Sequence, residues 1–470
     1  MRTDPPIRIL LVGLTILSVI GCTTAGVGSP APSAGSASSP ASARPTADQP
    51  VSPGPASSST PPSDAGTIPD AWLVVGRRGE PGIHVVVART GEVAFDLPAA
   101  TPRSPTSWER VMTATRDGDG TIVRDTLIED VTNTPEIRLA GYWRLPTVGL
   151  DPVPAGRSLD GSTVALVEDH TYDSSGGRSR FAIVQHQTGS FVSTDGDADL
   201  RLVRIIELRG AFEFDALSPD GRILYVVQHL DGDAGGHYQV RAVDVSTGVM
   251  RDAVIVDKTH PDESMAGSPI AQVRRPNGLV LTLYRGPEHP FIHALNSAEA
   301  WAVCIDLPAG GAADDAASLD WGLVDGLDDT SVFAVNASLG LAIEVDPTEL
   351  AVRRSASIGT TAAAPIVLAK FGHGAVGAIG RRVVPSPDGK LLFAGGANGV
   401  AVIRISDLAV VRTVLAGSAI DALGITPDGG ALFALLRGSG RIVAVDSSNG
   451  RQLGTIPGEG FDRLLAVAPW

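Results

Sequence analysis

A short turn sequence, Ser/Thr-Pro-Asp-Gly, occurs three times in this chain, and an apolar run follows each copy directly. The copies end at Gly221, Gly389 and Gly429. Proline presets φ at the second position of a turn, Ser or Thr suits the first position, and Gly closes the turn. Each copy therefore predicts a tight connection between two antiparallel strands. With two looser copies, the candidate turn residues are Asp160, Asp220, Asn277, Asp388 and Asp428.

A second turn signal follows further along each unit. An apolar run ends in Asp, three mostly polar residues come next, and Gly precedes another run, as in Asp244 to Gly248 and Asp446 to Gly450. Together the two signals define four strands, A to D. The Pro-Asp-Gly turn joins A to B, a variable loop joins B to C, and the second turn joins C to D.

Four antiparallel strands that repeat at roughly 40–60 residues are the pattern of β-propeller blades. We therefore predict an all-β fold, a propeller of eight four-stranded antiparallel blades. Unit 99–146 is degenerate, and without it the count is seven. The predicted units are 68–98, 99–146, 147–210, 211–260, 267–309, 315–358, 378–416 and 418–458.

The two ends of the predicted propeller complement each other. The first unit opens directly on Trp72 and lacks an innermost strand, whereas an unassigned apolar run, Phe461 to Pro469, closes the chain. A C-terminal strand that completes the N-terminal blade would close the ring and protect its sheet edges. We expect residues 68–470 to form this closed propeller.

The N-terminus carries the features of an export signal. Arg2 and Arg8 precede the apolar run Ile9 to Ile20, and Gly21 and Cys22 follow it. This order is typical of a secretory signal, and the last four residues resemble a bacterial lipobox. The resemblance implies cleavage after residue 21 and lipidation of Cys22. Two alternatives are an ordinary secretory signal with a chance cysteine and a short signal-anchor helix.

Residues 22–67 are predicted to be the lipidated cysteine and a disordered linker. Of the 45 positions from 23 to 67, 39 are Ser, Pro, Ala, Gly or Thr. Such a segment cannot bury enough apolar surface to offset its chain entropy. The expected location is thus a lipid anchor in the cell membrane, with the head on the extracytoplasmic side.

The propeller units resemble the YVTN/WD40-like β-propeller superfamily of exported bacterial proteins. The resemblance rests on the Pro-Asp-Gly turns and on strands such as Leu224 to Val227 and Val332 to Asn336. The YVTN tetrapeptide itself and the Trp-Asp pair of WD40 blades are absent. The resemblance implies binding platforms, lactonases and other enzymes alike, so it does not name the function.

Candidate site residues lie in long polar loops between strands B and C. In a propeller these loops share one face with the D–A loops. Imidazole and carboxylate together suit a divalent metal such as Zn²⁺ or Mn²⁺, and solvated loops are the alternative. No other cofactor is expected. The candidate ligands are His170, Asp173, His229, His237 and His289.

The net charge of −15 excludes the basic excess on which nucleic-acid binding depends. We therefore expect no nucleic-acid partner, a membrane contact through Cys22, and an envelope protein or glycan as a further partner. The sequence favours a binding or scaffold module at the cell envelope over an enzyme. The alternatives are an envelope hydrolase of the lactonase type, with a metal on the B–C loop face, and a purely structural domain of an envelope complex.

Overall fold

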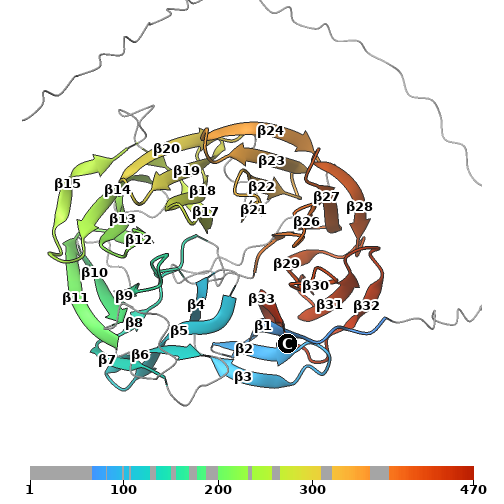
Figure 1. The fold of residues 1–470 in the computed structure, drawn as a ribbon, viewed down its shortest axis with the longest axis horizontal. Helices are drawn as coiled ribbons and strands as arrows, with labels where there is room; N and C mark the ends of the chain where they lie inside the picture. Colours follow the sequence, from blue (N-terminus) through green and yellow to red (C-terminus); the bar gives the residue numbers. More distant parts are fainter. Residues whose placement is uncertain are drawn as a thin grey trace, which may run out of the picture. The chain divides into compact units, whose positions relative to one another are not determined.

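Eight antiparallel sheets form a ring in the computed structural model of the chain (Figure 1). No described residue lies in an α-helix, and no helix long and apolar enough to cross a membrane occurs in the described part of the chain. The structure describes residues 66–80, 82–97, 100–104, 107–127, 134–149, 155–168, 177–186, 200–230, 236–256, 265–308, 320–359 and 380–469. The expected signal, Cys22 and most of the linker lie outside these ranges.

Each sheet is one blade, and we number the blades 1 to 8 along the chain. Blade 1 contains β1 to β3, and each later blade contains four consecutive strands in order. Blades 1 to 4 are formed by β1 (Ala71–Arg77), β2 (Ile83–Val87), β3 (Val93–Leu97), β4 (Ala100–Ser104), β5 (Ser107–Asp117), β6 (Gly120–Leu127), β7 (Glu136–Ala140), β8 (Trp143–Arg144), β9 (Thr163–Glu168), β10 (Arg178–His186), β11 (Leu200–Arg209), β12 (Phe212–Leu217), β13 (Ile223–His229), β14 (His237–Asp244) and β15 (Met250–Ile255).

The second half of the ring follows the same order, after the short strand β16 (Met265–Ala266), which pairs with β14. Blades 5 to 8 are formed by β17 (Ser268–Arg274), β18 (Leu279–Arg285), β19 (Pro290–Asn296), β20 (Trp301–Asp306), β21 (Trp321–Asp325), β22 (Val332–Asn336), β23 (Leu341–Asp346), β24 (Ala351–Ser357), β25 (Val383–Pro385), β26 (Leu391–Gly396), β27 (Gly399–Arg404), β28 (Ala409–Val414), β29 (Ile420–Ile425), β30 (Ala431–Leu436), β31 (Arg441–Asp446) and β32 (Gln452–Thr455).

The last strand, β33 (Phe461–Pro469), completes blade 1 as its innermost strand. It pairs antiparallel with β1 from Ala71 opposite Pro469 to Arg77 opposite Phe461. The predicted closure by the C-terminal strand is therefore confirmed. The predicted count of eight is confirmed as well, because the degenerate unit forms a full sheet, β4 to β7. The predicted third unit began four residues late, since its inner strand β8 starts at Trp143.

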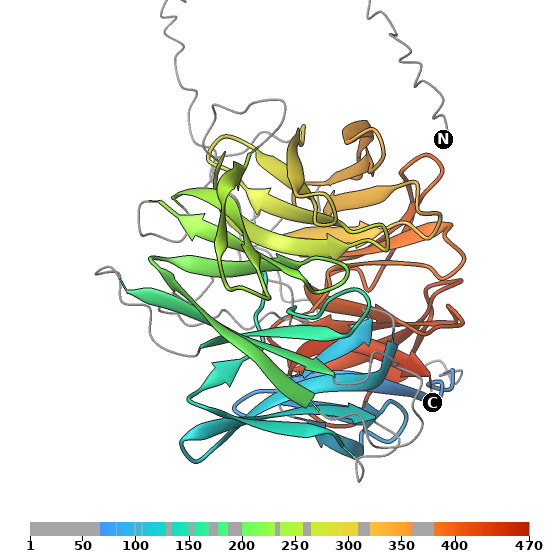
Figure 2. The same cartoon turned by 60° about the vertical axis from the view of Figure 1, so that its left-hand side comes forward.

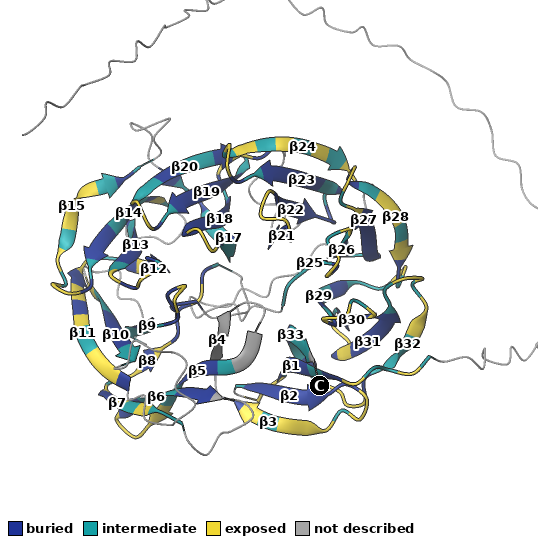
Figure 3. Cartoon of the chain, viewed as in Figure 1, coloured by how far each residue is buried: buried dark blue, intermediate teal, exposed yellow. Residues whose placement is uncertain are grey.

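The core is divided among the contacts between neighbouring blades. Eight clusters of buried apolar side chains lie in the described part of the chain, one between each pair of adjacent blades. One of them joins blades 8 and 1 and includes Leu464 of β33. The outermost strands face solvent, as the alternation of exposed and half-buried residues along β24 shows (Figure 3). Burial thus holds each blade between its neighbours around the ring. Figure 2 shows the ring turned by 60° from the view of Figure 1.

The Pro-Asp-Gly turns are stabilised by their own side chains. Ser386 donates a hydrogen bond to the Asp388 carboxylate (2.6 Å), which also accepts one from the backbone nitrogen of Lys390 (3.1 Å). These bonds, that from Ser386 first, hold the pKa of Asp388 down at about 2. The backbone nitrogen of Leu391 donates to Ser386 Oγ (2.9 Å) and closes the turn. The same arrangement recurs at Asp160, Asp220 and Asp428, and its backbone part recurs at Asn277.

Candidate functional site

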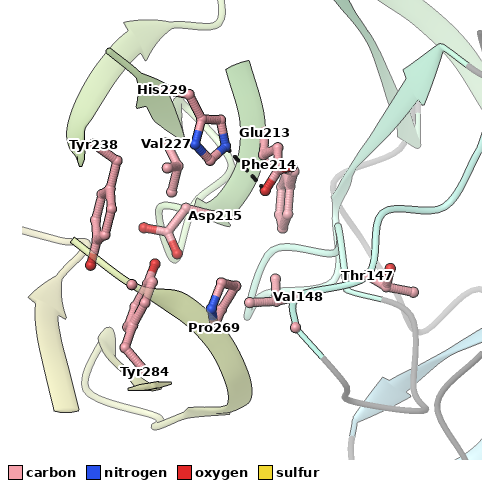
Figure 4. A pocket seen from close by; sticks show the side chains of 12 residues that line it. Thr147, Val148, Glu213, Phe214, Asp215, Val227, His229, Tyr238, Pro269 and Tyr284 are labelled. Atoms are coloured by element: carbon pink, nitrogen blue, oxygen red, sulfur yellow. Dashed lines mark ion pairs between the residues drawn. The ribbon is translucent and has the colours of Figure 1, made fainter. Parts of the chain in front are cut away.

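A cavity opens between blades 4 and 5, with blade 3 at one side (Figure 4). The centre of a water molecule could occupy a volume of about 20 Å³ inside this cavity. That space is enough for a single small group. The strand ends that line it adjoin the B–C and D–A connections, so it lies on the face where the sequence placed the candidate loops. The lining residues are Thr147, Val148, Gly149, Glu213, Phe214, Asp215, Val227, His229, Tyr238, Gly267, Pro269 and Tyr284.

Asp215 is the most deeply buried charged group of this cavity, with only 1% of its surface exposed. It lies on β12 where the pairing with β13 shifts register between Phe214 and Ala216. A bulge of this kind redirects a side chain, and here Asp215 points into the interface between two blades. Its Oδ1 accepts a hydrogen bond from the side-chain amide of Gln272 on β17 (3.3 Å). Its Oδ2 has no hydrogen-bond partner among the described residues.

Burial raises the pKa of Asp215 to about 7, and the hydrogen bond from Gln272 opposes this rise. The charged form of a carboxyl loses its hydration when it is buried, and only a partner can replace that hydration. One neutral amide does not suffice. Near neutral pH, Asp215 therefore either stays protonated or, as a carboxylate, requires a cation as its partner.

The other buried acids of the described chain have cationic partners. Arg110 contacts Asp125 at 3.1 Å and His186 contacts it at 2.9 Å. Burial alone would raise the pKa of Asp125, but the hydrogen bond from His186 and the nearby Arg157 lower it overall. The same pairing is found at Asp320 with Arg382 and at Glu344 with Arg353 and Arg354. Asp215 departs from this pattern, because no Lys or Arg is among the described lining residues.

Two tyrosines form the wall of the cavity opposite the bulge. The rings of Tyr238 and Tyr284 stack with centroids 5.1 Å apart and an angle of 17° between their planes. Phe291 continues the stack behind Tyr284, at 5.2 Å. In Figure 4 the carboxyl group of Asp215 lies between the His229 ring and the hydroxyl ends of the two tyrosines. Burial raises the pKa of both tyrosines well above the usual value, so both hydroxyls stay protonated.

His229 and Glu213 lie together at the edge of the cavity. The His229 Nε2 atom is 3.4 Å from the Glu213 carboxylate, whose side chain is 49% exposed, whereas the His229 side chain is 5% exposed. His229 is the sequence-predicted ligand that the structure places at the cavity. His237, also predicted, opens β14 next to Tyr238 in the chain but is exposed.

The remaining predicted ligands do not join this group in the described structure. His289 contacts Asp306 of its own blade at 2.9 Å, and His170 and Asp173 lie outside the described residues. Within the described ranges, no three His, Cys, Asp or Glu side chains gather closely enough to hold a metal ion. The metal site at these five residues stays a prediction.

Sequence reasoning missed Asp215, Gln272 and the two tyrosines. They lie inside strands, whereas the predicted ligands come from the predicted B–C loops. One signal was present: Asp215 and Glu213 are the two charged residues of the otherwise apolar segment from Phe212 to Leu217. A carboxylate inside an innermost strand needs a partner, and that need could have marked it.

Fold and cavity together place this chain among the eight-bladed β-propellers with a small polar cavity between two blades. No protein-family model matches the sequence, and no curated protein matches it. Solved structures with a similar chain path include AztD of Citrobacter koseri, with 14% identity, a TM-score of 0.49, and coverage of 85% of this chain and 97% of that one.

Two further solved structures are similar to this chain. One is the dihydro-heme d1 dehydrogenase NirN in complex with DHE, with 14% identity, 87% of this chain and 76% of that chain covered, and a TM-score of 0.49. The other is the periplasmic gluconolactonase PpgL of Pseudomonas aeruginosa, with 15% identity, 76% and 98% covered, and a TM-score of 0.40. Their activities are those of these proteins, and the likeness is one of fold.

Proposed function

We propose that this protein is a small-ligand-binding module, exported and tethered to the cell membrane through a lipid on Cys22. The binding site is the cavity between blades 4 and 5, and Asp215 is its central residue. One observation carries the site: a fully buried carboxyl group directs an oxygen without a partner into a cavity whose described lining holds no Lys or Arg. A ligand that satisfies this oxygen gains a hydrogen bond that no protein group provides.

The membrane location rests on the sequence alone. Arg2 and Arg8, the apolar run from Ile9, and the lipobox-like residues that end at Cys22 support export and lipidation. The linker that follows would hold the propeller away from the bilayer, so that the loop face is accessible from the envelope. An envelope protein or a glycan remains the proposed macromolecular partner of the propeller.

A thermal-unfolding screen tests the binding function. The full-length protein and an Asp215→Asn variant are heated with sugars, lactones, amino acids and amines. A ligand at 100 times its dissociation constant stabilises the folded state by about 2.7 kcal/mol, which corresponds to a few degrees for a protein of this size. We expect at least one compound to stabilise the wild type and not the variant. If every stabilising compound acts equally on both, the cavity is not the binding site.

The hydrolase alternative requires a catalytic metal site. A catalytic metal needs about three protein ligands at about 2–2.3 Å, whereas His229 and His289 each face a separate carboxylate, Glu213 and Asp306. The cavity at Asp215 therefore supports binding better than it supports metal-dependent hydrolysis. Hydrolysis of lactones by the wild type, lost on treatment with a chelator, would reverse this order.

A further inference from the structure

We propose, on the basis of the binding function proposed above, that the group bound at Asp215 is a primary ammonium group carried by a small ligand. The argument begins with charge. Asp125, Asp320 and Glu344 are buried acids that each contact an arginine of this chain. Asp215 is buried as fully as they are, and its described surroundings offer it the amide of Gln272 instead. The protein provides no arginine partner for Asp215, so the ligand would provide the cation.

The hydrogen-bonding capacity of the site favours an ammonium group over other cations. Such a group has three donors and no acceptor. The cavity presents the free Oδ2 of Asp215, and Tyr238 and Tyr284 line the same cavity with their hydroxyl groups as further acceptors (Figure 4). A quaternary ammonium ion has no N–H donor and would leave Oδ2 unsatisfied. An anionic ligand would be repelled by the Asp215 carboxylate.

The size of the cavity and its aromatic wall also favour a small ammonium group. The space of about 20 Å³ accepts one small group, and an ammonium is a compact charge, in contrast to the broad planar guanidinium. The stacked rings of Tyr238 and Tyr284 limit this space on one side. Glu213 at the edge is half-exposed and adds a negative charge along the approach. The remainder of the ligand would extend toward the loop face.

Ligand-observed NMR titration of the full-length protein at pH 8 tests the inference with n-butylammonium as the probe. Two controls separate charge from hydrogen bonding: n-butanol is neutral and similar in length, and tetramethylammonium is charged but has no N–H group. We expect n-butylammonium to bind at least about ten-fold more tightly than either control, because only this probe combines a positive charge with N–H donors.

Variants locate the binding. Asp215→Asn should weaken n-butylammonium binding about ten-fold or more, whereas Asp407→Asn, which removes an exposed acid paired with Arg404, should leave it unchanged. Tyr284→Phe keeps the ring and Asp215 and should weaken binding by a smaller factor. Glu213, His229 and Tyr238 are present in every variant, so their own titration does not account for the difference.

The outcomes separate this inference from the binding function itself. Equal binding of n-butylammonium and n-butanol, or undiminished binding to Asp215→Asn, overturns the ammonium inference. If the thermal screen then finds a neutral compound whose effect requires Asp215, the binding function stands and only the ligand class was wrong. If no compound depends on Asp215, both fail.

Discussion

The side-chain nitrogen of Gln272 lies 3.3 Å from Oδ1 of Asp215 and 3.2 Å from the backbone oxygen of the same residue. This contact joins the innermost strands of blades 4 and 5 at the cavity. The amide also donates toward Thr282 at 3.0 Å, so its orientation is held from two sides. The bond steadies the Asp215 carboxyl group but does not replace the hydration that burial removed.

Stability should therefore fall as the pH rises toward neutral. The pKa of Asp215 is about 7 in the folded protein and about 3.9 in an unfolded chain. Between these values the folded state holds a proton that the unfolded state has released, so the contribution of Asp215 is full below about pH 4 and is lost by about pH 7. Asp215→Asn lacks this loss. We expect the free energy of unfolding of the variant, relative to that of the wild type, to rise by about 2–3 kcal/mol between pH 5 and pH 8. Urea unfolding of both proteins at each pH measures this difference. Parallel pH profiles would contradict the raised pKa.

Two glycines of equivalent turns provide a matched test of packing. Gly221 and Gly389 have φ values of 68° and 69°, so alanine at either costs about 1–2 kcal/mol of backbone strain. A Cβ atom at Gly221 would also lie 2.4 Å from the Cβ of Thr163, whereas one at Gly389 would meet Leu327 at an ordinary 3.7 Å. Gly221→Ala should therefore be clearly the more destabilising variant in thermal unfolding. Equal losses would show that the contact with Thr163 relaxes at no cost.

Closure of the ring should depend on the apolar residues of β33. Leu464 is fully buried in the cluster between blades 8 and 1, and Leu464→Ala should cost about 2–5 kcal/mol. Leu327 is 56% exposed, so Leu327→Ala is the control and should change stability by less than about 0.5 kcal/mol. Urea unfolding followed by tryptophan fluorescence measures both. A loss at Leu464 as small as that at Leu327 would mean that β33 adds little to the closure.

Divalent metals should leave the unfolding midpoint unchanged if the described residues alone decide metal binding. His229 and His289 are occupied by separate carboxylates, and the described part of the chain gathers no trio of ligands. The test is thermal unfolding with EDTA and with added Zn²⁺, Mn²⁺ or Ca²⁺. A drop of a few degrees with EDTA that one metal restores would instead support the predicted site, and single alanine variants of His170, Asp173 and His237 would then identify its ligands.

Lipidation predicts the partition of the protein between detergent and water. The wild type, expressed in a bacterial host, should enter the detergent phase and incorporate labelled fatty acid, whereas Cys22→Ala should do neither. The reason is that acyl chains supply the anchoring, at about 0.8 kcal/mol per buried CH₂ group. If Cys22→Ala stays in the membrane fraction without label, the apolar run from Ile9 to Ile20 is a signal anchor.

Turn chemistry made the fold predictable, because Pro, Asp and Gly at fixed positions leave few alternatives for the backbone. The same logic could not find the turn of blade 6, where Leu327, Asp328 and Asp329 replace Pro-Asp-Gly. Asp329 adopts the positive φ of 54° that Gly has elsewhere, which Asp tolerates. Blade 2 was doubtful for a related reason, since its strands form without a Pro-Asp-Gly turn.

The cavity was beyond the reach of the sequence for a different reason. Strand alternation predicts which face of a sheet a residue occupies only while the register is regular. The irregularity between Phe214 and Ala216 changes the direction of Asp215, and the partner Gln272 comes from another blade. His229 was found because it ends a strand at a polar loop, although its contact with Glu213 depends on pairing within blade 4.

The pairing of Ala71 with Pro469 determines how the propeller would respond to a mechanical load. Any pull through the proposed tether enters the folded part at the beginning of β1. That strand is hydrogen-bonded along both sides, to β2 and to β33, so it cannot be peeled from an open edge. Extraction of β1 would require both hydrogen-bonded ladders to break at once. The pairing with β33 would therefore strengthen the fold at the point where the tether pulls.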